Sequence, residues 1–193
     1  MTISDRIRVK DVRILSNERY TLKNVTFEWR RADGRWQTLT REIYDRGNAA
    51  AILPYNVARR TVLLVRQLRY PAYVNDYNDL LIEVPAGLLE DEQPEARIRA
   101  EAEEETGYRL HDVHKVLEAF MSPGAATEKI HCFVAEYEPQ MRIGAGGGLP
   151  DEGEDIEVLE LAIDEAMAMI ADGRIVDAKT IILLQYLVLN VFP

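Results

Sequence analysis

The sequence has one cysteine, three histidines and no long apolar run. One cysteine cannot form an intrachain disulfide, so we expect a reducing, cytoplasmic location and a buried strand position for Cys132. The first twenty residues carry charged side chains throughout and lack the apolar segment of a secretory signal, so we expect no signal peptide. The apolar stretch 181–192 contains Gln185 and Asn190 and is shorter than the roughly 20 residues that span a bilayer. It predicts a core helix and no membrane partner.

Basic residues are also fewer than acidic ones. The chain has 23 Lys and Arg against 33 Asp and Glu, which gives a formal net charge of −10. Proteins that bind nucleic acids depend on basic patches, so we expect no nucleic-acid partner. Hydrophobic residues make up 47% of the 193 residues and charged residues 29%, a balance typical of a folded protein. The length allows one domain with an appendage.

Apolar and alternating segments predict an α/β fold. The predicted strands span 7–16, 22–31, 35–45, 49–55, 61–68, 80–84, 113–121, 129–137 and 157–161, and the predicted helices span 94–106, 164–171 and a segment that begins at 178. Asp33-Gly34 predicts a hairpin turn. We expect residues 1–46 to form a small antiparallel sheet, 47–193 to form the main domain, and the glycine-rich loop 144–153 to be mobile. The small sheet has too few residues for its own core and must pack on something.

Three carboxylates share one face of the helix predicted at 94–106. Glu101, Glu104 and Glu105 are three or four residues apart, and like charges at this spacing cost a few tenths of a kcal/mol per pair. Hard oxygen ligands suit Mg²⁺ or Mn²⁺, so the cluster predicts a metal site. On the helix pattern alone, a solvated acidic face is the alternative interpretation.

The residues around this helix, from Gly87 through Glu90-Asp91-Glu92 to Glu101-Ala102-Glu103-Glu104-Glu105-Thr106-Gly107-Tyr108, resemble the Nudix box. The box is G-x5-E-x7-R-E-U-x-E-E-x-G-U, where U is a bulky aliphatic residue. The loop here is one residue shorter, Ala100 stands where the family has an arginine, and Ala102 takes an aliphatic position. In the family that arginine orients the metal-binding glutamates. Arg97, four residues before Glu101, or Arg99 is the candidate substitute.

Met121-Ser122-Pro123-Gly124 resembles a marker of the ADP-ribose and nucleotide-sugar pyrophosphatases within this family. Segments 44–48, 145–148, 154–161 and 179–180 are similar to a branch of bacterial GDP-mannose pyrophosphatases. The resemblance implies a Nudix α/β/α sandwich with a mixed sheet. It also implies hydrolysis of GDP-mannose to GMP and mannose 1-phosphate with Mg²⁺, for which Mn²⁺ can substitute. The alternatives are an ADP-ribose pyrophosphatase that gives AMP and ribose 5-phosphate, and a non-catalytic Nudix-fold regulator.

The resemblance also implies roles for individual residues. The implied metal ligands are the carbonyl of Ala86 and the side chains of Glu101, Glu104, Glu105 and Glu154. The implied catalytic residues are Glu154, Glu104 and Glu105, with Glu152 as the rival general base. The implied substrate contacts are Arg19, Thr40, Arg41, Glu42, Arg69, Ala86, Gly87, Glu128 and Lys179. In related enzymes the N-terminal sheet packs against a second subunit, which implies a homodimer.

Overall fold

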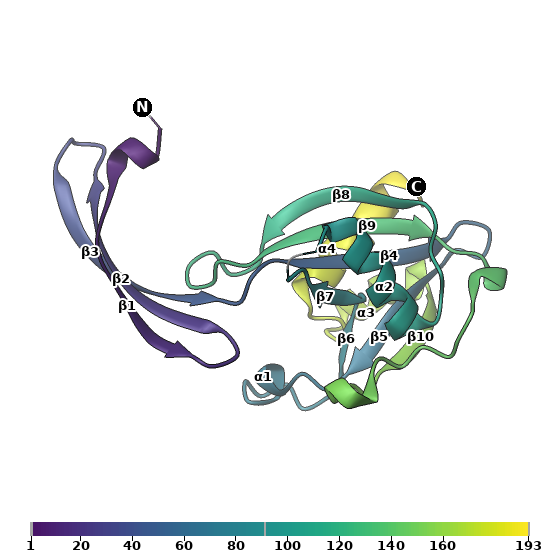
Figure 1. Cartoon of the computed structure of the whole chain (residues 1–193). Helices are drawn as coiled ribbons and strands as arrows, with labels where there is room; N and C mark the ends of the chain where they lie inside the picture. The colour runs from purple at the N-terminus through teal and green to yellow at the C-terminus, as the bar shows by residue number, and fades with distance from the viewer. Residues whose placement is uncertain (1, 91, 193) are drawn as a thin grey trace. The chain divides into compact units, whose positions relative to one another are not determined.

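The computed structural model describes residues 2–90 and 92–192, and it confirms a mixed α/β fold (Figure 1). The chain divides into two compact units. Residues 1–48 and 122–129 form the N-terminal unit, and residues 49–121 and 130–193 form the main unit. The segment that carries Ser122-Pro123-Gly124 therefore belongs to the N-terminal unit, although the residues before and after it in the sequence belong to the main unit.

The N-terminal unit is an antiparallel sheet of three strands. They are β1 (Ile7–Asn17), β2 (Thr21–Arg30) and β3 (Trp36–Asp45), preceded by a 3-10 turn at Ser4–Arg6. Segment 122–129 lies along the end of β3, because Tyr44 N donates to Ala125 O (2.8 Å) and Thr127 N donates to Tyr44 O (3.1 Å). No residue of these three strands is buried within the chain. The expectation that this sheet lacks its own core is therefore confirmed.

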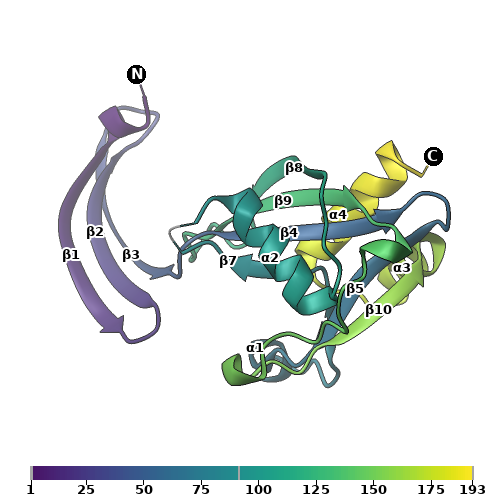
Figure 2. The same cartoon turned by 45° about the vertical axis from the view of Figure 1, so that its right-hand side comes forward.

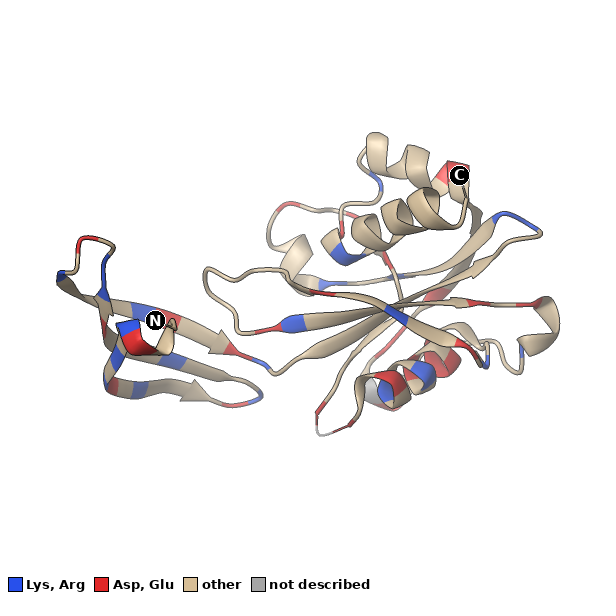
Figure 3. Cartoon of the chain, turned by 90° about the horizontal axis from the view of Figure 1, so that it is seen from above, with Lys and Arg blue, Asp and Glu red and all other residues tan. Residues whose placement is uncertain are grey.

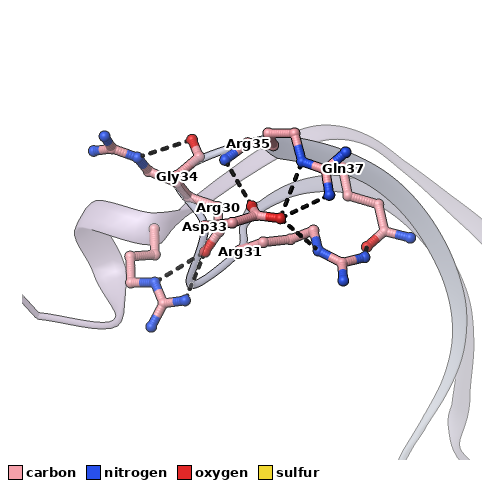
Figure 4. Close-up of polar contacts among 7 residues, drawn as sticks. Arg30, Arg31, Asp33, Gly34, Arg35 and Gln37 are labelled. Atoms are coloured by element: carbon pink, nitrogen blue, oxygen red, sulfur yellow. Dashed lines mark hydrogen bonds and ion pairs between the residues drawn. The ribbon is translucent and has the colours of Figure 1, made fainter.

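The predicted Asp33-Gly34 turn joins β2 to β3 (Figure 4). Gly34 has a φ of +85°, a backbone conformation that glycine adopts without strain. Asp33 Oδ1 accepts a hydrogen bond from Arg35 N (3.0 Å), and its Oδ2 accepts one from Arg35 Nη2 (2.7 Å). The aspartate thus closes the turn through both backbone and side chain.

The main unit is built on a mixed sheet of seven strands in the order β10-β5-β4-β9-β8, with β6 beside β5 and β7 beside β4. The strands are β4 (Ala49–Asn56), β5 (Thr61–Gln67), β6 (Leu81–Glu83), β7 (Ala86–Leu88), β8 (Val113–Phe120), β9 (Lys129–Glu136) and β10 (Glu157–Ala162). Strands β4 and β9 are parallel, whereas β4 pairs antiparallel with β5 and β7. The predicted mixed sheet is confirmed.

Helices cover both faces of this sheet (Figure 2). They are α2 (Pro94–Thr106), α3 (Ile163–Ala171) and α4 (Ala178–Asn190). Side chains of β4 alternate between two cores: Ala51 and Leu53 pack with α3 and α4, whereas Ile52 packs with α2. This alternation produces the predicted α/β/α sandwich.

One short helix and one short strand were not predicted, and neither were the 3-10 turns at Ser4–Arg6, Pro139–Met141 and Pro150–Glu152. Helix α1 (Tyr70–Tyr73) is a single turn without a buried residue, so it has no apolar period to detect. Strand β7 has three residues and lies where the sequence predicted neither a strand nor a helix. The predicted C-terminal core helix is confirmed, since Leu183, Leu184 and Leu187 of α4 are fully buried. Among the described residues, none of the helices combines the length and apolarity needed to cross a membrane.

Candidate active site

Helix α2 places two of its three predicted carboxylates against the sheet. Pro94 occupies the first turn, and Gly107 ends the helix with a φ of +77°, so that its N–H donates to Glu103 O (2.9 Å). Ile98 and Ala102 are fully buried, and Glu101 and Glu105 are 6% and 1% exposed. Glu104 is half-buried. The interpretation of a solvated acidic face therefore fails for Glu101 and Glu105.

The backbone of β7 lies directly against Glu101. A Cβ atom at Gly87 would collide with the Glu101 carboxylate, so only glycine leaves room for this side chain. Ile52 N donates to Pro85 O (3.0 Å), and Ala51 pairs with Ala86 in the same antiparallel ladder. Backbone groups alternate along such a ladder, so the carbonyl of Ala86 points away from β4. The Ala86 carbonyl is therefore not used in the ladder with β4, and the next residue of β7, Gly87, lies against the Glu101 carboxylate.

Burial and neighbouring carboxylates disfavour the ionised forms of Glu101 and Glu105. Burial raises the pKa of the Glu105 carboxyl well above its usual value, and Glu101, Glu83 and Glu154 raise it further, while Arg69 opposes them. Among the described residues, Glu105 Oε2 is buried without a hydrogen-bond partner. Burial also raises the pKa of Glu101, although the neighbouring guanidinium of Arg97 lowers it. A cation at this position would relieve both effects.

Arg97 contacts Glu101, as expected if Arg97 substitutes for the arginine that the Nudix box has at the position of Ala100. Its Nη2 donates to Glu101 Oε1, whereas Arg99 pairs with Glu95 (2.8 Å) and donates to the carbonyl of Leu110 (2.9 Å). Of the two arginines considered as substitutes, only Arg97 reaches a box glutamate. The structure brings a guanidinium to Glu101 from the preceding turn of the same helix.

The glycine-rich loop carries Glu154 to the same cluster. Gly148 N donates to Glu104 O (3.1 Å), and Gly147 N donates to Glu105 O (2.9 Å), so the loop binds the last carbonyls of α2. A Cβ atom at Gly148 would collide with Glu154, whose Oε2 accepts a hydrogen bond from Leu149 N (2.9 Å). The loop that we expected to be mobile is thus tied to α2 in this part. The side chain of Glu152 lies outside the described residues.

The donor set fits a hard divalent cation, because it consists of carboxylate and carbonyl oxygens with one orphaned oxygen atom. The described carboxylates do not yet converge, since no three Asp, Glu, His or Cys side chains among them lie close enough to hold an ion. Arg97 engages Glu101, and Leu149 N engages Glu154. A cation bound by these two carboxylates would replace those hydrogen-bond partners.

A second charged cluster lies at the end of β6. Glu83 is 2% exposed, and it accepts hydrogen bonds from Arg69 Nε (2.6 Å) and from Lys179 Nζ (2.5 Å). Lys179 also pairs with Asp177 (3.0 Å). Arg69 and Lys179 were predicted substrate contacts, and the structure brings them to one carboxylate. We did not predict a functional role for Glu83. A glutamate within the otherwise apolar segment 80–84 could have indicated one.

The remaining predicted substrate contacts lie in the N-terminal unit. Arg19, in the turn between β1 and β2, lies over the Tyr20 ring (5.6 Å to its centroid). On β3, Thr40 hydrogen-bonds Thr26 (3.1 Å), and its neighbours Arg41 and Glu42 are exposed. Glu128 pairs with Arg46 (3.4 Å). The structure leaves the roles of these residues as predictions.

The family models that match this chain meet at residues 44 and 45, close to the boundary between the two structural units. A family model described as the NUDIX domain matches residues 45–184, and one described as the GDP-mannose pyrophosphatase NudK N-terminal domain matches residues 6–44. A GDP-mannose pyrophosphatase of Klebsiella pneumoniae is 52% identical over 180 residues, which cover 93% of this chain and 89% of that protein. One from Escherichia coli O6:K15:H31 is 51% identical and covers 93% of each.

A solved structure titled as that of an ADP compounds hydrolase has a similar fold. Its TM-score is 0.71 over 94% of both chains. The sequence identity is 18%, so this likeness concerns the fold alone.

Proposed function

Because the chain belongs to the Nudix hydrolase family, we propose that it hydrolyses GDP-mannose to GMP and mannose 1-phosphate with Mg²⁺ as its cofactor. The observation that carries the metal-dependent chemistry is the pair of buried, mutually repelling carboxylates Glu101 and Glu105, of which Glu101 lies against the backbone of Gly87. The substrate follows from the relatives that are about half identical over most of the chain and are named for it. Mn²⁺ has the same preference for oxygen ligands and can substitute.

In this proposal Glu101, Glu105, the Ala86 carbonyl and Glu154 hold the cation, with Glu104 as a further ligand. When bound, a divalent cation neutralises the diphosphate and lowers the pKa of a coordinated water. Arg69 and Lys179 bind diphosphate oxygens through directed N–H donors. Glu154, Glu104 and Glu105 are the candidate general bases, because each carboxylate lies on α2 or on the loop tied to it. Arg19, Thr40, Arg41, Glu42, Gly87 and Glu128 remain proposed substrate contacts.

The substrate is tested by incubating the purified protein with GDP-mannose or ADP-ribose and separating the nucleotide products by chromatography. We expect GMP and mannose 1-phosphate from GDP-mannose, loss of both products with EDTA, and recovery with Mg²⁺ or Mn²⁺. Predominant release of AMP from ADP-ribose would replace GDP-mannose as the proposed substrate. Binding of either nucleotide without metal-dependent turnover would favour a regulatory protein instead.

We also propose a homodimer formed through the N-terminal sheet. Val9, Val12 and Ile14 of β1 are 61%, 53% and 60% exposed, and covering such side chains contributes about 1.5–3 kcal/mol each. Residues 1–48 carry eleven Lys and Arg against seven Asp and Glu, a net charge of +4, so the rest of the chain carries −14 (Figure 3). Two copies can therefore pair a basic, apolar sheet with an acidic surface.

Light scattering coupled to size-exclusion chromatography tests the dimer. We expect a mass of twice 22.0 kDa for the wild type. Val12→Asp should shift the protein toward the monomer, because it places a charge on the apolar strand face. Ser16→Asp changes an exposed polar residue of the same strand and serves as the control. A monomeric wild type would contradict the proposal.

The cytoplasm is our proposed location, with no nucleic acid or membrane as a partner. The support is the single, buried Cys132 and the negative net charge. Burial raises the pKa of this thiol to about 11, which makes it unreactive at neutral pH. Recovery of the protein in a membrane or periplasmic fraction of cells would contradict this location.

A further inference from the structure

Glu83 is an ionisable residue at the centre of a buried segment. It stands between Ile82 and Val84, which are 7% and 0% exposed, and its own side chain is 2% exposed. Burying a carboxylate is costly unless cations and hydrogen bonds compensate it. Arg69 and Lys179 supply that compensation, one at each carboxylate oxygen.

The elements around Glu83 are held in register by further hydrogen bonds. Val84 N donates to Thr180 Oγ1 (2.9 Å), which ties β6 to the first turn of α4. Asp177 caps this helix, because its Oδ2 accepts a hydrogen bond from Thr180 N (3.0 Å). The same aspartate pairs with Lys179. Glu83 and Asp177 thus fix the ammonium group of Lys179 from two elements.

Both cations keep donors for another ligand. An ammonium group has three N–H donors, and Lys179 uses two of them on Glu83 and Asp177. The bond from Arg69 to Glu83 uses Nε, and the two Nη atoms of Arg69 carry four more donors. The Arg69 side chain is 42% exposed, so these donors are accessible. One carboxylate therefore fixes the spacing of an accessible guanidinium and of an ammonium group whose side chain is 12% exposed.

We propose that Glu83 is a positioning residue, which holds Arg69 and Lys179 as a spaced pair of donors for adjacent oxygens of the substrate diphosphate. This inference rests on the proposed function for the identity of the substrate. Arg69 and Glu83 lie near Glu105 of α2, since Glu83 raises and Arg69 lowers the pKa of its carboxyl. The cluster has no net charge, because two cations, Arg69 and Lys179, balance the two carboxylates of Glu83 and Asp177. The pair therefore binds through directed hydrogen bonds, whose geometry depends on Glu83.

The test is Glu83→Gln, which keeps the shape of the side chain and removes its charge. If Glu83 only balanced charge, the variant would have a more positive site, and KM would fall. Under the positioning role, the two cations separate, and we expect KM for GDP-mannose to rise about tenfold or more while kcat changes less. In a background of Arg69→Gln and Lys179→Gln, the same change should have little further effect on KM, because its effect passes through these residues.

Calorimetric titration with inorganic pyrophosphate in metal-free buffer gives a readout that does not need turnover. We expect Glu83→Gln to weaken this binding as well. Glu157→Gln is the control, because it removes one carboxylate from an exposed pair with Arg66 on the same sheet. If Glu83→Gln does not fold, Glu83→Asp replaces it, since the shorter side chain cannot reach both cations and should also raise KM.

Unchanged or tighter pyrophosphate binding and an unchanged or lower KM in a folded Glu83 variant would overturn the positioning role. A fall in unfolding temperature alone, with KM as in the wild type, would do the same. A wild type that leaves GDP-mannose intact would overturn the proposed function only. In that case the pyrophosphate affinities of the wild type and the variants still decide the role of Glu83.

Discussion

Replacing Glu105 by Gln is expected to lower kcat/KM for the proposed substrate by on the order of 10³-fold or more. Glu105 is 1% exposed, and its Oε2 has no partner among the described residues, so its charge is available to a cation. Losing this ligand removes the several kcal/mol by which a metal stabilises phosphoryl transfer. Steady-state kinetics over a range of Mg²⁺ concentrations measures the effect.

The same variant should remain folded. The folded pKa of Glu105 is raised above its usual value, so ionisation of this group destabilises the folded state once the pH exceeds the unfolded pKa. Gln carries no charge, and in metal-free buffer near pH 7 the variant should unfold at the same or a higher temperature. Glu103→Gln is the matched control, since Glu103 pairs with Arg109 (2.9 Å) on the other face of α2 and should keep wild-type kinetics. Full activity of Glu105→Gln would exclude it as a metal ligand.

Adding one methyl group at Gly87 is expected to lower kcat/KM about 10²-fold. The backbone of Gly87 is not in the left-handed region, so alanine is allowed there, but its Cβ would occupy the position of the Glu101 carboxylate. Glu101 must then turn away from β7, and misplacement of a ligand by about 1 Å has effects of this size. The apparent Mg²⁺ affinity, obtained from activity at varied metal concentration, should fall as well.

Gly144→Ala is the control for this change. A Cβ atom at Gly144 meets other atoms only at ordinary contact distance, at 4.0 Å, and its backbone is not left-handed either. We expect this variant to retain wild-type kinetics and stability. If Gly87→Ala is equally active, then the Glu101 carboxylate does not act from the position that the structure gives it.

Local patterns predicted most of the fold. Pro94 and Gly107 bracket α2, and both of its ends lie where these residues predicted them. Alternating side chains of β4 serve two cores, which is why an uninterrupted apolar segment in the sequence forms a central strand. Helix α1 and strand β7 escaped prediction because their three or four residues show no period, whereas β6, which is equally short, lies within the apolar segment 80–84.

The candidate site was predicted in part, because some of its features depend on contacts between distant segments. The spacing of Glu101 and Glu105 placed them on one face of α2, but their burial depends on β7 and on the packing of α2. Arg97 could be proposed from its distance of four residues to Glu101, and the ion pair is present. Glu83 was missed because its partners, Arg69 and Lys179, are 14 and 96 residues away in the sequence.

The hydrogen bonds from Gly147 and Gly148 to the end of α2 link two processes that are usually independent. The last turn of a helix frays when its terminal carbonyls lose their partners, and a loop opens when its anchoring bonds break. Here both processes break the same bonds, so displacement of the segment next to Glu154 and fraying of α2 form one cooperative event. The hydrogen-exchange rates of the Gly147 and Gly148 amide protons therefore measure how often the loop detaches from the end of α2.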